Sequence, residues 1–230
     1  MRLELRPAVR ALRARRHVID GISVHLTRRP ANDVVVATLG VGPETARRRT
    51  DQLLDVLEHR GTPVAHVVVT GVAGGIDGVS PIGALVVPAR IIDLITGASF
   101  TSTSLGAREP ADTMATTGRQ LLTDPAVLAG LRARGIRALD METAAVAAAC
   151  RERGDIPWTA FRSISDRPDD KIVDPAVANL LHDDGRADVA AALKLMIRHP
   201  RRIPGFMRLG RESALAAKVA ARAAAAAVIA

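Results

Sequence analysis

Two β-prone segments joined by a small-residue helix constrain the fold of this chain more than any other feature. Residues 136–140 form a short apolar segment, and Asp140-Met141-Glu142 then leads into an Ala-rich helix that we expect to end near Cys150. A second apolar segment, residues 156–164, should form a strand that carries Ser165 and Asp166 at its carboxyl end. This pattern predicts that Glu142 and Asp166 lie at the ends of neighbouring strands, where open α/β sheets bind their ligands.

Other segments predict further strands and helices. Residues 17–29 should form an edge hairpin, and residues 34–38 a buried strand that ends in a Gly-rich turn before a helix at 44–60. Residues 66–70 read as a buried strand followed by the glycine-rich sequence TGVAGGID, and residues 83–92 as another strand. With 230 residues, a single α/β domain with a full core is expected.

Charge is unevenly distributed along the chain, whose net charge is +8. Residues 1–16 carry six Arg against one Glu, and residues 198–230 carry seven basic residues against one Glu, so the remainder has a net charge of −3. Because the central part is not basic, we expect no nucleic-acid partner. The start of the chain lacks an apolar signal core and no apolar run reaches the roughly 18 residues of a membrane span, so we expect a cytoplasmic protein.

Three motifs carry a family resemblance. LDMETAAVAAAC and FRSISD, with TGVAGGID upstream, resemble signature segments of the purine nucleoside phosphorylase and uridine phosphorylase superfamily. They are most similar to its methylthioadenosine/S-adenosylhomocysteine nucleosidase branch. The resemblance implies a central twisted, mixed sheet flanked by helices, a small-molecule nucleoside substrate, no cofactor and a homodimer.

The resemblance also implies roles for individual residues. Asp166 would protonate the leaving purine, next to Ser165, while Glu142 would accept hydrogen bonds from the ribose hydroxyls and Met141 would pack beneath the sugar. The backbone around Val72 and Gly74 would approach the ligand closely. Glu4 would be the general base that activates water, since it stands three positions after Met1, as the family's catalytic Glu does after its Met. The strand that precedes this Met in the family is absent from the sequence.

Departures from the family pattern bear on the chemistry and the substrate. Val69 and Val72 stand where the phosphorylases have an Arg and a Ser that contact phosphate, which favours hydrolysis over phosphorolysis. Leu121 stands where an aromatic ring would stack on the purine, so substrate preference is open. His182-Asp183-Asp184 has no second His cluster near it in sequence, so no metal site is expected.

Residues 199–230 form a basic, Ala-rich helical appendage beyond a catalytic domain at 1–198. They are expected to pack on the domain or on a partner subunit; alternatively, the mixture of Arg with apolar residues indicates peripheral contact with anionic membrane or a lipid-linked substrate. The favoured function is hydrolysis of a 5'-substituted adenosine with release of adenine. Two alternatives remain, a phosphorylase-type enzyme acting on a lipid-linked adenosine such as adenosylhopane and a catalytically degenerate nucleoside-binding protein.

Overall fold

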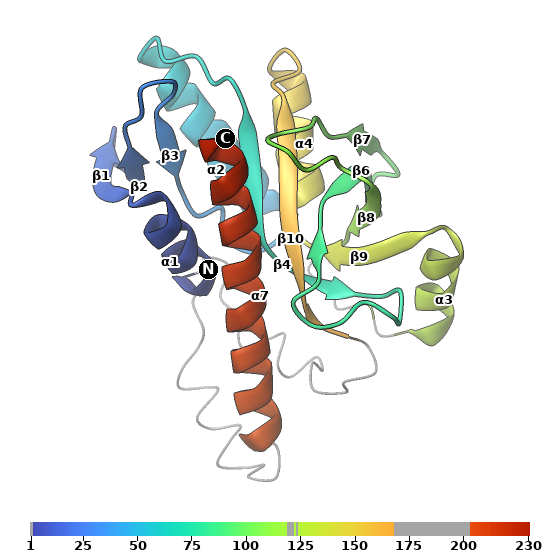
Figure 1. Ribbon diagram of the computed structural model, residues 1–230. Helices are drawn as coiled ribbons and strands as arrows, with labels where there is room; N and C mark the ends of the chain where they lie inside the picture. Colours follow the sequence, from blue (N-terminus) through green and yellow to red (C-terminus); the bar gives the residue numbers. More distant parts are fainter. Residues whose placement is uncertain (1, 119–121, 123, 168–202) are drawn as a thin grey trace.

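A computed structural model describes residues 2–118, 122, 124–167 and 203–230 (Figure 1). Leu121 and the motif His182-Asp183-Asp184 lie outside these residues, and so do residues 175–198, whose apolar periodicity predicts a helix. The described strands form two sheets, one of three strands and one of seven.

The seven-stranded sheet has the order β5-β10-β4-β9-β8-β6-β7. Its strands are β4 (Val67–Gly75), β5 (Leu85–Val86), β6 (Pro88–Asp93), β7 (Ser99–Thr101), β8 (Asp112–Thr116), β9 (Ile136–Asp140) and β10 (Trp158–Asp166). β10 runs parallel to β4, and β8 runs parallel to both β6 and β9, whereas the pairings of β4 with β9, β5 with β10 and β6 with β7 are antiparallel. The expected mixed sheet is therefore confirmed.

The strand that precedes Glu142 and the strand that ends at Asp166 are not neighbours, contrary to the prediction. β4 lies between β9 and β10 and pairs with β9 only at its last two residues, Gly74 and Gly75. Residues 71–75 of the glycine-rich sequence, which were expected to follow a strand, form the second half of β4. Its glycines leave room for neighbouring side chains, because a Cβ at Gly75 would lie 2.9 Å from the side chain of Ile164.

The small sheet contains β1 (Arg15–Ile19), β2 (Ile22–Thr27) and β3 (Val34–Val36). β1 and β2 form the expected antiparallel hairpin, with Val24 fully buried. β3 pairs with β2 and its residues are only half-buried, so the prediction of a buried strand over residues 34–38 is wrong in part. The reason is its position at the edge of a small sheet.

Helices cover both faces of the large sheet (Figure 1). They are α1 (Arg2–Leu12), α2 (Pro43–His59), α3 (Pro125–Ala133), α4 (Thr143–Glu152) and α7 (Ile203–Ile229). The core around α4 includes Ala160 and Ile164 of β10, whereas the core around α7 includes Phe161. Because successive strand residues point to opposite faces, α4 and α7 lie on opposite sides of β10.

Some helix boundaries and burial states differ from those expected. The first helix begins at Arg2, and Pro7, a residue that favours the first turn of a helix, lies inside it. The tail forms one 27-residue helix, α7, in which Pro204 and Gly205 cause no break. Cys150 is buried, and its burial raises the pKa of the thiol to about 12. None of the described helices is long and apolar enough to cross a membrane.

Candidate active site

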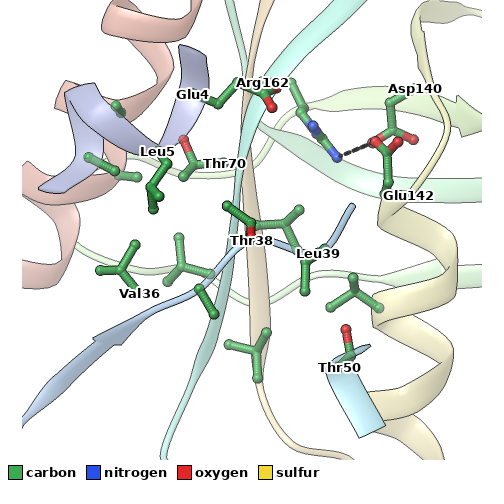
Figure 2. A pocket seen from close by; sticks show the side chains of 18 of the residues that line it. Glu4, Leu5, Val36, Thr38, Leu39, Thr50, Thr70, Asp140, Glu142 and Arg162 are labelled. Atoms are coloured by element: carbon green, nitrogen blue, oxygen red, sulfur yellow. Dashed lines mark hydrogen bonds and ion pairs between the residues drawn. The ribbon is translucent and has the colours of Figure 1, made fainter. Parts of the chain in front are cut away.

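A cavity of about 690 Å³ brings together the site residues that the sequence indicates. It is lined by residues from α1, β3, α2, β4, β10 and α7, and Figure 2 shows part of this lining. The predicted site residues found in the lining are Glu4, Val72, Gly74, Met141, Glu142, Ser165 and Asp166. Leu121 lies outside the described residues, although the adjacent Leu122 lines the same cavity.

Arg162 is the central charged residue of the site. Its side chain is only 4% exposed, and its Nη2 lies 2.6 Å from Oδ2 of Asp140 and 3.5 Å from Oε2 of Glu142 (Figure 2). Its Nη2 also donates a hydrogen bond of 2.9 Å to the hydroxyl of Thr143 at the start of α4. A buried guanidinium requires such counter-charges, because an unpaired charge in the interior is costly.

Asp140 holds this arrangement in place. Its carboxylate accepts hydrogen bonds from the hydroxyl of Thr116 at 2.6 Å and from the backbone N–H of Thr143 at 3.2 Å, and it also bonds to the Thr143 hydroxyl. The sequence reading assigned no role to Asp140 or Arg162. The sequence did contain a signal for this pair. Arg162 stands in the middle of an apolar segment, and an Arg in a buried strand requires an acidic partner.

Glu142 lies between a glycine loop and the buried arginine. Its Oε1 accepts a hydrogen bond of 3.1 Å from the backbone N–H of Gly42, a residue with a φ of 86° that favours glycine. Burial raises the pKa of Glu142 to about 7, and the repulsion by Asp140 adds to this effect while Arg162 opposes it. The glycine loop after β3 thus reaches the carboxylate expected to bind ribose.

Glu4 reaches the cavity from the first turn of α1. Its Oε1 accepts a hydrogen bond of 3.0 Å from the backbone N–H of Val72 in β4. Gly71 permits this approach, because a Cβ there would lie 2.5 Å from Glu4 Oε1 and 2.6 Å from Nη1 of Arg162. Glu4 and Arg162 therefore meet at one point of β4.

Asp166 is the last residue of β10 and lines the cavity beside Gly74. The Ser165 hydroxyl donates a hydrogen bond of 2.6 Å to Oδ1 of Asp166. A Cβ at Gly74 would lie 3.4 Å from Oδ2 of Asp166, so the carboxylate packs directly over the glycine backbone. The serine and the glycine together orient the carboxylate at the end of the strand.

The rest of the cavity lining is mostly apolar. Within the described part of the chain it contains no Phe or Trp, and Phe100, Trp158 and Phe161 are buried in the core instead. The described residues also contain no group of three or more His, Cys, Asp or Glu that could hold a metal ion. This part of the site therefore offers a ligand aliphatic side chains and backbone rather than a Phe or Trp ring.

Comparisons with solved structures agree with this fold. Futalosine hydrolase of Helicobacter pylori is 16% identical with a TM-score of 0.69, and the alignment covers 100% of this chain and 94% of that one. A 5'-methylthioadenosine/S-adenosylhomocysteine nucleosidase of the same organism is also 16% identical, with a TM-score of 0.66 and coverage of 96% and 91%. A third protein, from Borrelia burgdorferi, is described as a putative nucleosidase of this type bound to adenine; it is 15% identical, with a TM-score of 0.70 and coverage of 100% and 96%.

The family assignment comes from the sequence. No curated protein matches the chain. The family model described as the phosphorylase superfamily matches residues 6–119 and 95–199, which together span most of the sequence. The chain belongs to the phosphorylase superfamily.

Proposed function

We propose that this enzyme cleaves the N-glycosidic bond of a purine nucleoside by hydrolysis, with a 5'-substituted adenosine as substrate and adenine as product. The observation that carries the proposal is that Glu4 of α1, Glu142 at the N-cap of α4 and Asp166 at the end of β10 reach one cavity. A nucleosidase and a hydrolase among the structurally similar proteins support the same reaction class.

Each carboxylate has a separate task in the proposed reaction. As the bond breaks, positive charge develops on the ribose and the leaving purine needs a proton, so an acid and a base must act on opposite sides of the sugar. Asp166 supplies the proton to the purine, and Glu4 takes a proton from the attacking water. Glu142 accepts hydrogen bonds from the ribose hydroxyls, and Met141 packs against the sugar.

The charge balance of the cavity favours water over phosphate as the nucleophile. The acidic residues of the lining are Asp33, Glu4, Asp140, Glu142 and Asp166, against the guanidinium groups of Arg162 and Arg167. Arg162 is already engaged with two carboxylates, and a phosphate dianion would have to compete with them. Val69 and Val72, which replace the phosphate ligands expected by resemblance, offer no side-chain donor.

The test is chromatographic detection of free adenine from methylthioadenosine and adenosylhomocysteine, with and without phosphate. Adenine release without phosphate is expected, and Asp166→Asn should reduce kcat by about 10²- to 10⁴-fold, the usual contribution of a general acid. Asp124→Asn serves as the matched control, because Asp124 caps α3 and does not line the cavity. Release that requires phosphate would contradict hydrolysis, and full activity of Asp166→Asn would contradict its role as the acid.

A further inference from the structure

A second, smaller cavity lies where the end of α1 meets the hairpin of β1 and β2. Its volume is about 320 Å³, and the hairpin lies at the margin of the molecule, next to α1 (Figure 1). The residues that line it are Arg13, Arg15, His17, Leu26, Thr27 and Arg28. We call this cavity the basic pocket, because three of these residues are arginines and none of the described residues that line it is acidic.

The register of the hairpin places several of these side chains on one face of the small sheet. Arg15 pairs with Leu26, and His17 pairs with Val24. Because side chains alternate along a strand and paired residues share a face, Arg15 and His17 lie on the same face as Leu26. Arg28 stands two positions after Leu26, directly beyond the end of β2. The hairpin therefore brings Arg15 and Arg28 to one end of the same face.

The backbone holds Arg13 beside this face. Arg13 has a φ of 53°, in the left-handed region that residues other than glycine rarely adopt. Its N–H donates a hydrogen bond of 3.2 Å to the carbonyl of Arg10, and the hydroxyl of Thr27 donates one of 2.8 Å to the carbonyl of Leu12. These bonds join the end of α1 to the end of β2 and keep Arg13 in the lining of the basic pocket.

The three arginines of the basic pocket have no ion pair among the residues that the structure describes. Other arginines of this chain do have acidic partners; Arg60, for example, lies 2.5 Å from the carboxylate of Asp20. Like charges at neighbouring positions of a hairpin repel each other and destabilise it. Arg13, Arg15 and Arg28 therefore form a cluster of positive charge that the described part of the chain does not neutralise.

The negative end of α1 explains only part of this cluster. Cations near the carboxyl end of a helix are stabilised by its dipole, which accounts for Arg13. Arg15 and Arg28 belong to the hairpin, and the carbonyl of Leu12 is already capped by the hydroxyl of Thr27. An anion from outside the chain would neutralise all three guanidinium groups.

We propose that the basic pocket binds a small anion that carries two or more phosphate groups. A guanidinium donates two parallel hydrogen bonds to a phosphate, so three of them can engage more than one phosphate group. The ring of His17 adds an N–H donor in either tautomer. A free polyphosphate compound and the headgroup of a phospholipid share this chemistry, and the experiment separates the two sources.

The basic pocket is separate from the candidate active site. None of the residues that line it lines the large cavity that contains Glu4, Glu142 and Asp166. The inference therefore goes beyond the proposed function and does not rest on it. Because no nucleoside is needed to test it, failure of one proposal leaves the other intact.

The experiment titrates sodium tripolyphosphate into the 230-residue chain and measures Kd by calorimetry. The double variant Arg15→Gln/Arg28→Gln should weaken binding by about tenfold or more, because two charge-assisted contacts are lost. The matched control is Arg48→Gln/Arg134→Gln, which removes the same charge from exposed positions of α2 and of the end of α3, outside the basic pocket. Its Kd should be close to that of the unchanged protein.

Thermal unfolding provides an independent measurement. A ligand that binds only the folded state raises Tm, so tripolyphosphate should raise it for the unchanged protein and the control but not for Arg15→Gln/Arg28→Gln. Without ligand, this double variant should be at least as stable as the unchanged protein, because repulsion between the arginines is reduced. A clear loss of stability without ligand would contradict the repulsion on which the proposal rests.

Amide NMR of the unchanged protein locates the bound anion. We expect shifts at Arg13, Arg15 and His17, whereas shifts confined to the surroundings of Arg162 would place the anion in the large cavity and overturn the proposal. Absence of saturable binding would overturn it too. So would equal weakening by the two double variants, which would indicate general attraction to a chain of net charge +8.

Vesicles identify the source of the phosphate groups. Vesicles that contain cardiolipin, a lipid with two phosphates, are compared with pure phosphatidylcholine vesicles by co-sedimentation. Binding to the cardiolipin vesicles that tripolyphosphate displaces and that Arg15→Gln/Arg28→Gln abolishes would support the basic pocket as a headgroup site. Binding of tripolyphosphate without binding to the vesicles would support it as a site for a free anion.

Discussion

The guanidinium of Arg162 lies 2.6 Å from the carboxylate of Asp140, and the two side chains are 4% and 1% exposed. Arg162 comes from β10 and Asp140 from the end of β9, with β4 between the two strands. The pair thus links two strands that do not pair with each other. The pair also determines the electrostatic potential at Glu142, whose Oε2 lies 3.5 Å from the same guanidinium.

Removing one member of this pair should destabilise the protein strongly. Asp140→Ala leaves the Arg162 charge buried without its main partner, and such changes cost about 3–5 kcal/mol. The free energy of unfolding is measured by urea denaturation. Glu152→Gln is the control, because it breaks the exposed pair with Arg47 and should have a much smaller effect. Similar losses for the two variants would contradict this account.

Glu142 should make both substrate binding and stability depend on pH near neutrality. Its pKa is raised to about 7, and only the ionised carboxylate accepts hydrogen bonds with both oxygens. KM for the nucleoside should therefore fall as pH rises through about 7. The profile is measured by initial rates at several substrate concentrations, in a buffer series of constant ionic strength.

The effect of pH on the stability of the protein has the opposite sign to its effect on substrate binding. In the folded protein Glu142 binds its proton more tightly than in the unfolded chain, so between about 4.5 and about 7 the folded state holds more protons. The contribution of this group to stability is present at low pH and is lost as pH rises through that window. Glu142→Gln should remove this component of both profiles, and an unchanged pH dependence in the variant would assign it to another group.

Gly71→Ala should impair activity. The added Cβ would lie 2.5 Å from Oε1 of Glu4 and 2.6 Å from Nη1 of Arg162, so both groups must move. Displacement of a catalytic group by about 1 Å can reduce the rate by about 10²-fold, so we expect a fall in kcat of at least tenfold. Gly130→Ala is the control, because Gly130 lies in α3 with open space around it and Ala favours helix by about 1 kcal/mol. Activity of Gly71→Ala equal to that of Gly130→Ala would exclude this role of Gly71.

The packing of α7 on the sheet requires small residues. Ala224 is 5% exposed and belongs to the same buried cluster as Phe161 of β10 and Val87. Ala220 of the same helix is fully buried and does not line the cavity, so Ala220→Leu should lower the free energy of unfolding by about 1–3 kcal/mol through overpacking. Ala226→Leu makes the same change at an exposed position of the same helix and should be close to neutral. Thermal and urea unfolding distinguish the two, and equal stability of both variants would mean that α7 does not pack as described.

Local sequence patterns predicted several elements correctly. β9, α4 and β10 lie within about two residues of the expected positions, because an apolar run, an Ala-rich run and a second apolar run follow one another with clear boundaries. β7 and β8 were missed, since residues 93–115 are short of apolar residues and rich in Thr, Ser and Gly. These strands form because they pair with the edges of β6 and β9. A local sequence pattern contains no information about such pairing.

The sequence by itself determined which residues stand at the ends of strands, because apolar periodicity and turn residues are local properties. Glu142 and Asp166 were identified in this way, and the motifs around them predicted the family. Only the tertiary structure decided that β4 lies between β9 and β10, that Arg162 is neutralised by Asp140, and that an apolar gap separates β3 from β4. Strand order and buried ion pairs depend on contacts between residues far apart in the chain, which only the packing of the whole chain determines.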